Sequence, residues 1–324
     1  MQRTLRSTRD AYGEALLRLG EANPNVVVLD ADLSSSTRTG LFAARFPERF
    51  FDVGIAEQNL YGVAAGLAAC GKIVFASTFA VFATERALNQ IRQSIAYPGL
   101  NVKIACSHAG FTASGDGGSH QTLIDVSLMR CLPNMTVVVP ADAVQTELAV
   151  EAAARLRGPV YLRLGKTEVP ILFERQSPFQ IGKAILMRPG ADVTVLAAGI
   201  LLERTMLAVE RAGREGISAE LLNVHTVKPL DEDGILRSVR KTAAAVTVEE
   251  HSVVGGLGGA VAELLAGKHP APLECVGVQD VFGESGSEEE LYARHGLTVE
   301  GILAKIQLAV ARKRSSSSRV GIEG

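Results

Sequence analysis

One carboxylate stands immediately ahead of an almost uncharged segment. The run FDVGIAEQN (51–59) places Glu57 just before LYGVAAGLAAC (60–70), whose apolar and small residues are typical of a buried helix. In the first turn of such a helix, the dipole and the free backbone N–H groups stabilise an acid. Burying a carboxylate is costly unless a partner binds or neutralises it. The alternative is a plain acid on a surface helix, but the apolar surroundings favour a buried acid with a partner.

A second group of reactive side chains lies in the polar, glycine-rich loop SHAGFTASGDGGSHQ (107–121). Two histidines, His108 and His120, flank the acid Asp116. Histidine suits proton transfer or contact with an anion, and an aspartate can accept a hydrogen bond from a substrate hydroxyl. Alternatively, Asp116 is a turn residue and His120 a helix cap. Because all three side chains share one loop after a strand, we favour a site.

Phe79 and Phe82, in STFAVFATER (77–86), directly follow an apolar strand. At a spacing of three they are predicted to share one helix face, where aromatic residues are more often part of the core. A flat heteroaromatic ring stacked on one of them is the functional alternative. The sequence leaves open whether Arg86 and Arg92 are solvated or bind phosphate.

The composition indicates two medium-sized α/β domains. The chain has 324 residues, of which 47% are hydrophobic, and a formal net charge of -2, so each domain can bury its own core. The near-neutral charge argues against nucleic acid or a membrane as partner, and no apolar run reaches the roughly 18 residues of a transmembrane helix. Nothing predicts a metal site, and a cytoplasmic location is expected. The scattered cysteines, expected to be reduced and buried, are Cys70, Cys106, Cys131 and Cys275.

Short apolar runs alternate with helical stretches, as in parallel sheets covered by helices on both faces. We predict an α/β fold of two doubly wound domains, 1–167 and 191–311, joined by a proline-containing linker, 168–190, and followed by a disordered basic tail, 312–324. Strands are predicted at 26–32, 72–78, 102–107, 135–142, 159–165, 193–199, 219–224, 244–251 and 273–278. In the first domain, helices are predicted near 9–20, 57–70, 83–96, 120–131 and 143–157.

Polar residues recur where the strands of the first domain end. Ligands of parallel α/β sheets bind outside the carboxyl ends of the strands. We therefore expect these residues to converge on one edge of the sheet: Asp30, Asp32, Ser77, Thr78, His108 and Asp142.

With these residues assembled, the chain resembles the C-terminal half of transketolase and of the related 1-deoxyxylulose-5-phosphate synthase, from about Arg6 to about Ala311. The motifs that carry the resemblance are DADLSSS (30–36), FDVGIAEQN (51–59), ASTFAVF (76–82), the two histidines of the 108–120 loop, LPNMTVVVPAD (132–142) and EEHSVVGGLGGAVAE (249–263). The resemblance implies a domain that binds the pyrimidine of thiamine diphosphate, followed by a transketolase C-terminal domain. It also implies a split enzyme, in which a separate N-terminal subunit binds the diphosphate and Mg²⁺, and an α2β2 assembly is expected.

The resemblance implies roles for single residues. Glu57 would hydrogen-bond the aminopyrimidine ring and favour the imino tautomer that deprotonates thiazolium C2. Phe79 and Phe82 would pack around the pyrimidine, and Asp32 would lie near the cofactor. The residues implied for the substrate are His120 at the donor hydroxyls, Asp116 at the acceptor C2 hydroxyl, and His108, Arg6, Ser36 and Lys166 at the phosphate.

Two positions depart from the family pattern. Gly115 stands where relatives usually have Glu, and Lys166 stands where they have a phosphate-binding arginine. Lysine keeps the charge but lacks the bidentate fork of arginine. The departures bear on the substrate, which is a sugar phosphate or another acid-bearing sugar, more than on the reaction.

Two glycine motifs are interpreted as structural. GDG (115–117) matches the start of the diphosphate motif of thiamine enzymes, but its companion asparagine pair is missing. VGGLGGAVAE (254–263) opens a helix after a strand, as a dinucleotide fingerprint does, but lacks the third glycine and the acid of that motif. We interpret the second motif as close packing of a helix on a strand.

The leading hypothesis is a transketolase subunit that moves a two-carbon ketol unit between sugar phosphates and is active only with its partner. Alternatives are half of a 1-deoxyxylulose-5-phosphate synthase-like enzyme or of a 2-oxoacid dehydrogenase beta-type enzyme, the latter without need of Asp116 and His120. A non-catalytic binding subunit is a third possibility, which the joint presence of Glu57, Asp116 and His120 argues against. The weakest alternative is nucleotide binding at the 255–259 turn.

Overall fold

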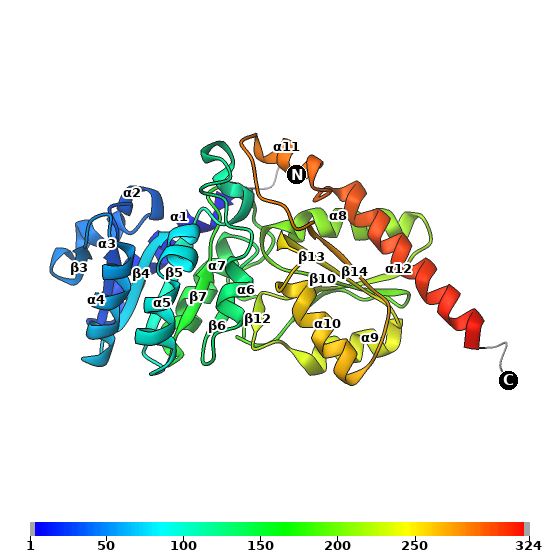
Figure 1. Ribbon diagram of the computed structural model, residues 1–324, viewed down its shortest axis with the longest axis horizontal. Helices are drawn as coiled ribbons and strands as arrows, with labels where there is room; N and C mark the ends of the chain where they lie inside the picture. The colour runs from blue at the N-terminus through cyan, green and yellow to red at the C-terminus, as the bar shows by residue number, and fades with distance from the viewer. Residues whose placement is uncertain (1–3, 321–324) are drawn as a thin grey trace.

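The computed structural model describes residues 4–320, with side chains described as far as residue 315, and these residues form two α/β domains side by side (Figure 1). Within this range, one sheet has seven strands in the order β12-β6-β7-β5-β4-β2-β3, and another has five in the order β14-β13-β10-β11-β9. Most neighbouring strands in both sheets run parallel. The predicted α/β class with two doubly wound sheets is confirmed.

The first sheet lies between two layers of helices. On one side, α1 (Thr8–Ala22) and α7 (Ala143–Arg155) share a core with alternate residues of the strands. On the other side, the opposite strand faces pack on α4 (Glu57–Ala69), the helical stretch 82–96 and α6 (Asp125–Arg130). The parallel strands are β2 (Val26–Asp30), β3 (Phe50–Asp52), β4 (Ile73–Phe79), β5 (Val102–Ser107), β6 (Thr136–Val138) and β7 (Val160–Arg163).

The two faces of the second sheet lie in different apolar clusters, one of which also contains part of the core of the first sheet. The parallel strands of the second sheet are β10 (Val193–Ala197), β11 (Ala219–Asn223), β13 (Ala245–Ser252) and β14 (Leu273–Val278), with β9 (Ile185–Arg188) antiparallel at the edge. The accompanying helices are α8 (Leu202–Arg214), α9 (Glu232–Thr242), α10 (Leu257–Lys268), α11 (Glu288–Arg294) and α12 (Val299–Val320).

Short strands tie the two halves of the chain together, and the sequence analysis missed them. The predicted linker contains β8 (Glu168–Pro170), which pairs with β1 (Leu5–Ser7), as well as β9. In addition, β12 (Thr226–Lys228) from the second half joins the first sheet beside β6. Edge strands of three or four residues carry too little apolar pattern to be distinguished from a loop.

The expected disorder after residue 311 does not agree with the structure, because α12 continues as far as Val320. Its apolar residues Ile302 and Ile306 lie in the second core, and the Lys313 Nζ donates to the Asp192 carbonyl, 3.0 Å away. Residues 321–324 lie outside the described residues. The cysteines also differ from expectation, because Cys70 and Cys131 are exposed whereas Cys106 is buried.

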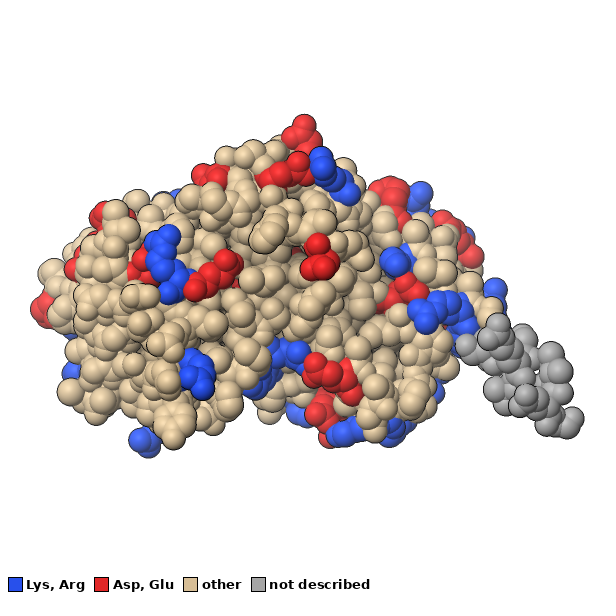
Figure 2. All heavy atoms as spheres, viewed as in Figure 1, with Lys and Arg blue, Asp and Glu red and all other residues tan. Residues whose placement is uncertain are grey.

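Acidic and basic side chains are interspersed on the face of the molecule drawn in Figure 2. Over residues 4–320, no helix combines the length and the apolar character needed to cross a membrane. Within the same part of the chain, no three His, Cys, Asp or Glu side chains gather in a way that would hold a metal ion.

Candidate functional site

Glu57 is a buried acid at the first position of α4, as the sequence predicts, with 4% of its surface exposed. Its Oε1 accepts a hydrogen bond from the Arg86 Nη1 at 2.8 Å. Arg86 ends the π-helical turn η2 (Phe82–Arg86) that follows β4. The sequence left the partner of Arg86 open, and in the structure its guanidinium binds the Glu57 carboxylate. The helix itself is only half buried, because Gly62 and Val63 face outward.

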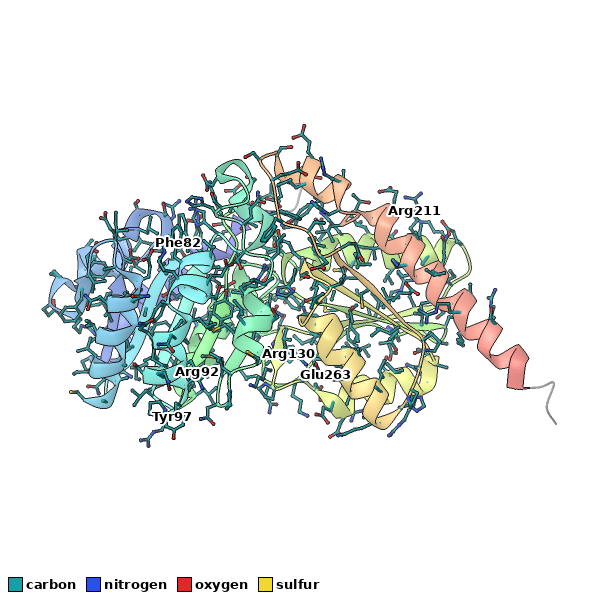
Figure 3. All side chains as sticks on the ribbon, in the orientation of Figure 1. Phe82, Arg92, Tyr97, Arg130, Arg211 and Glu263 are labelled. Atoms are coloured by element: carbon teal, nitrogen blue, oxygen red, sulfur yellow. The ribbon has the colours of Figure 1, made fainter. Side chains whose placement is uncertain are left out.

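Four rings form a continuous series beside this ion pair. We call Phe79, Phe82, His108 and His120 the ring series. The Phe79 ring stacks on that of His108 at 3.8 Å between centroids and on that of Phe82 at 5.7 Å. The His120 ring meets Phe82 edge-on at 5.4 Å, and the Arg86 guanidinium lies 4.6 Å from the Phe82 centroid. Figure 3 labels Phe82 on the upper side of the first domain.

The two phenylalanines meet in a different way from the one predicted. Phe79 is the last residue of β4, whereas Phe82 opens η2, so they do not share a helix face. Their rings are nearly parallel, at 14°. The turn from strand to helix produces the stack, and it leaves Phe82 partly exposed. A flat aromatic ligand thus has a ring to pack against.

His108 is an uncharged member of the ring series at neutral pH. Burial, together with the charges of Arg9, Lys166 and His120, lowers the pKa of His108 to about 3. The residue is 2% exposed and has a φ of 58°, and its Nδ1 lies 2.9 Å from the Ser107 Oγ. His108 can therefore exchange hydrogen bonds with a ligand, but it does not contribute a positive charge.

Asp116 and Lys166 face each other across the mouth of the site. Asp116 ends η4 (Gly110–Asp116), and its Oδ2 lies 3.9 Å from the Nζ of Lys166, which follows β7. Both side chains are about two-fifths exposed, at 42% and 40%. Because Lys166 also acts on the pKa of His108, the structure brings three of the predicted substrate residues into one area.

Arg6 and Arg9 occupy different surroundings, and the sequence analysis chose only the first. The Arg6 guanidinium pairs with Glu147 at 2.9 Å and with Glu14 at 2.5 Å, so it is already bound to carboxylates. The Arg9 Nη1 donates to the Ser36 carbonyl at 3.0 Å, and its charge is one of those that depress the pKa of His108. Arg9 therefore lies near His108 and is a candidate beside Arg6. Arg6 lies on the strand β1, ahead of the N-cap Ser7, whereas Arg9 lies in the first turn of α1, and the sequence alone did not show this boundary.

The loop after β2 is organised by Asp30 rather than by Asp32. Asp30 is fully buried and accepts hydrogen bonds from the backbone of Leu33 and from the hydroxyls of Thr37 and Thr39. Burial raises its pKa to about 6. Asp32 is exposed, with a φ of 61°, and remains free to face a ligand at the rim.

Not every polar residue at a strand end belongs to the site. Asp142 caps α7 by accepting a hydrogen bond from the Gln145 N–H, and it also accepts from the N–H groups of Leu172 and Phe173. The Ser77 hydroxyl is hydrogen-bonded to that of Tyr12 within the core. These groups support the fold, so the predicted convergence holds for only part of the set.

The glycine-rich start of α10 is close packing, as interpreted from the sequence. The Glu249 carboxylate accepts hydrogen bonds from the N–H groups of Leu257 and Gly258, both at 2.7 Å. A Cβ at Gly256 would lie 2.2 Å from a Glu249 oxygen. This internal carboxylate occupies the helix terminus that a nucleotide phosphate would need, which argues against a nucleotide site at 255–259.

One of two cavities borders the ring series, and the other does not. One, of about 350 Å³, is bounded by Val81 and Ser119, next to the ring series, and by Phe282 of the second domain. Another, of about 790 Å³, is lined by Arg130 and Glu263, which Figure 3 labels on the lower side, and by no predicted site residue. We place the site at the ring series because the charges and rings gather there.

The sequence matches two domains of one family. Residues 5–171 match the transketolase pyrimidine binding domain, and residues 182–302 match the transketolase C-terminal domain. The chain belongs to the transketolase family. The position of the ring series and Glu57 within residues 5–171 places them in the pyrimidine-binding domain of this family.

Three transketolase relatives resemble the chain over nearly its whole length. It is 46% identical to the 6-deoxy-6-sulfo-D-fructose transketolase subunit of Clostridium sp. strain MSTE9, over 94% of this chain and 95% of the relative. It is 35% identical to one subunit of the apulose-4-phosphate transketolase of Phocaeicola vulgatus, over 93% of this chain and 97% of the relative. A solved structure of a split-gene transketolase, an inactive beta4 tetramer, superposes with a TM-score of 0.89 at 52% identity, covering 95% of this chain and 99% of that one.

Proposed function

We propose that the chain is the C-terminal subunit of a thiamine-diphosphate-dependent transketolase. It transfers a two-carbon ketol unit from a ketose phosphate to an aldose phosphate, together with an N-terminal subunit that binds most of the diphosphate and the Mg²⁺. The observation that carries the proposal is the buried Glu57 carboxylate beside the ring series. Two relatives that match over nearly their whole length are named as transketolase subunits, which supports a two-subunit enzyme, for which we propose an α2β2 assembly.

The residues present fit the pyrimidine half of the cofactor. Glu57 has an acceptor oxygen for a ring nitrogen, Phe82 offers a partly exposed aromatic face, and Phe79 supports that face from behind. Asp32 is exposed on the neighbouring loop. When bound, thiamine diphosphate supplies the carbon nucleophile that adds to a ketose carbonyl. The role of Glu57 is to hold the proton-accepting form of the pyrimidine by hydrogen-bonding its ring nitrogen.

The residues at the mouth of the site fit an acidic sugar. Arg9 and Lys166 supply positive charge, and the neutral His108 supplies hydrogen bonds near them. Asp116 and His120, on the loop above, face the same area and suit sugar hydroxyls. The relatives named above act on a sulfonated sugar and on a sugar phosphate, both of which carry a strong acid group. We propose this class of substrate, with Ser36 beside Arg9 completing the acid-binding group.

The experiment is turnover of the chain reconstituted with its N-terminal subunit, thiamine diphosphate and Mg²⁺. Glu57→Gln should lower kcat by at least about 100-fold, because the amide cannot exchange a proton with the ring nitrogen. Glu48→Gln, at an exposed glutamate, is the control and should leave kcat unchanged. Wild-type turnover by Glu57→Gln at saturating cofactor would contradict the catalytic assignment.

Two further measurements separate the alternatives. The chain alone should show negligible turnover, and full activity without a second subunit would rule out the split enzyme. Product analysis with xylulose 5-phosphate and with pyruvate distinguishes a transketolase from a 1-deoxyxylulose-5-phosphate synthase or a 2-oxoacid dehydrogenase. Transketolase activity requires the ketose to serve as donor and pyruvate to fail.

A further inference from the structure

The loop that carries Asp116 and His120 rests on the second domain. Gln121, directly after His120, is 5% exposed, and its Nε2 donates to two carbonyl oxygens. One belongs to Ser114, at the start of the same loop, at 3.0 Å. The other belongs to Glu284, between β14 and α11, at 2.9 Å. A single amide group thus closes the base of the 114–121 loop and links it to the second domain, where the two meet near α11 in Figure 1.

Glycines on both sides allow this contact. A Cβ at Gly283 would lie 1.9 Å from the Gln121 Oε1. A Cβ at Gly118, on the loop, would lie 2.4 Å from the Gly283 carbonyl oxygen. At Gly118 a side chain would meet the backbone of residue 283, and at Gly283 it would have to displace the Gln121 amide, because real Cβ contacts are not this short. The two backbones are therefore packed directly against each other.

The segment of the second domain is itself held firmly. The Glu284 carboxylate accepts from the Arg294 Nε at 2.6 Å, a surface pair that links the segment to α11. From α11 and the residue after it, Tyr292 and His295 pack on Phe111, at 6.2 Å and 4.9 Å between ring centroids. The 114–121 loop therefore rests on a supported surface rather than on a second loose loop.

The contact is not needed to hold the two domains together. A buried ion pair already joins the domains, because Arg163 of the first domain is bonded to Glu250 of the second. In the loop itself, by contrast, Asp116 is 42% exposed and pairs with Lys166 only at the long distance of 3.9 Å. The position of Asp116 and His120 therefore depends on the base of their loop, which Gln121 closes.

We propose that Gln121 is a positioning residue that ties the substrate loop to the second domain. Through it, the second domain, which supplies none of the predicted site side chains, sets the position of Asp116 and His120 and hence the affinity for the sugar. The part of this inference that concerns the sugar rests on the proposed function, whereas the part that concerns the order of the loop does not.

The first test uses the chain alone and measures amide hydrogen exchange. Gln121→Glu keeps the shape but replaces the donating amide nitrogen by an acceptor that faces carbonyl oxygens, and Gly283→Ala displaces the Gln121 amide. Both should speed exchange at the amides of Gly117, His120 and Gln121 by at least about tenfold, since each donates a hydrogen bond within the loop. Unchanged exchange in Gln121→Glu would overturn the proposal whatever the enzyme does.

Two neighbouring positions give matched controls. Gln279→Glu alters a glutamine whose Nε2 bonds locally, to the Gly277 carbonyl two residues away. Gly286→Ala adds a methyl group whose nearest neighbours, Leu291 side-chain atoms at 3.4 Å, are at ordinary contact distance. Both controls should keep the wild-type exchange of the loop. A loop loosened equally by the controls would also overturn the proposal.

The second test uses the reconstituted enzyme and separates positioning from a general loss of structure. Gln121→Glu should raise the KM for the sugar by about tenfold, the equivalent of one lost hydrogen bond. The Kd of thiamine diphosphate should stay within about twofold, because Glu57 and Phe79 lie on α4 and β4, and Phe82 meets the loop only through the edge-on contact with His120. Equal loss of cofactor and sugar binding would refute a positioning role. If the wild-type pair shows no transketolase activity, the proposed function fails while the exchange result still decides the loop contact.

Discussion

Arg163 is the buried cation at the junction of the two domains, and removing it gives the sharpest prediction about stability. Its Nε donates to the Asp125 Oδ2 at 2.7 Å, its Nη1 lies 3.3 Å from the Glu250 Oε2, and its Nη2 donates to the Glu250 carbonyl at 2.8 Å. The side chains of all three residues are at most 6% exposed. One guanidinium thus neutralises two buried carboxylates from different domains.

Arg163→Met would leave those carboxylates without their counter-ion. Asp125 would keep the Tyr161 hydroxyl, and Glu250 would keep the Tyr292 hydroxyl and the Phe111 N–H. These neutral donors do not replace a charge, and breaking a buried pair by removing one partner costs about 3–5 kcal/mol. We therefore expect the free energy of unfolding to fall by about that amount.

The loss should grow with pH. Burial, only partly offset by Arg163, raises the pKa of Glu250 to about 7, from a reference of 4.5. Between those values the native protein binds a proton that the unfolded chain does not, so the contribution of Glu250 to stability falls as pH rises. Without Arg163 the pKa rises further. The variant should therefore lose more stability above about pH 8 than below about pH 6.

Urea unfolding followed by circular dichroism measures the effect. The control is Arg155→Met, the same substitution at a side chain that is 78% exposed and forms a surface pair with Glu151, where a change below about 0.5 kcal/mol is expected. Arg163→Met combined with Glu250→Gln should recover part of the loss, because one unpaired charge is removed. An Arg163→Met protein within about 0.5 kcal/mol of wild type at pH 8 would refute this account of the interface.

Three other predictions concern single groups. In the reconstituted enzyme, Arg9→Met should raise the KM for the sugar by about tenfold or more and Arg6→Met much less, since Arg6 is committed to carboxylates. The pKa of His108 is about 3 in the native protein and 6.5 in the unfolded chain, so the free energy of unfolding should fall as the pH drops below about 6.5. His108→Asn, which tolerates the same φ, should make the free energy of unfolding less dependent on pH in this range. Glu249→Ala should lower the free energy of unfolding by about 1.5–3 kcal/mol by freeing two N–H groups of α10, whereas Glu263→Ala, 69% exposed on the same helix, should change it little.

The central strands could be predicted from the sequence, and the edge strands could not. Runs such as 26–30 and 193–197 are mostly apolar because both faces of the strand are covered, and this signal needs no tertiary information. The short strands β1, β8 and β12 exist because a neighbouring strand offers free backbone groups. Their own residues do not encode that neighbour. The end of α12 was missed for a related reason, since its packing on the second core extends a helix into a polar segment.

In the candidate site, too, some residues could be predicted from the sequence and others could not. Glu57 and the ring series lie in motifs whose residue types identify them, so their positions could be predicted. Arg9 lies in α1 whereas Arg6 lies on β1, and Gln121 has a role only because residue 284 lies beside it. Sequence reasoning therefore proposed side chains by their chemical type, and it missed those whose role depends on a contact in the folded protein.

The residues proposed for the pyrimidine and those proposed for the sugar are held in place by different parts of the protein. Glu57 and Phe79 belong to α4 and β4, which are fixed by the central core of the first domain. Asp116 and His120 belong to a loop whose base is fixed by the second domain. Substitutions in that loop or in residues 283–285 are expected to shift the proposed sugar contacts while Glu57 and Phe79 stay in place. Relatives named for different acidic sugars are what such an arrangement permits, because the substrate can change while the support of Glu57 stays intact.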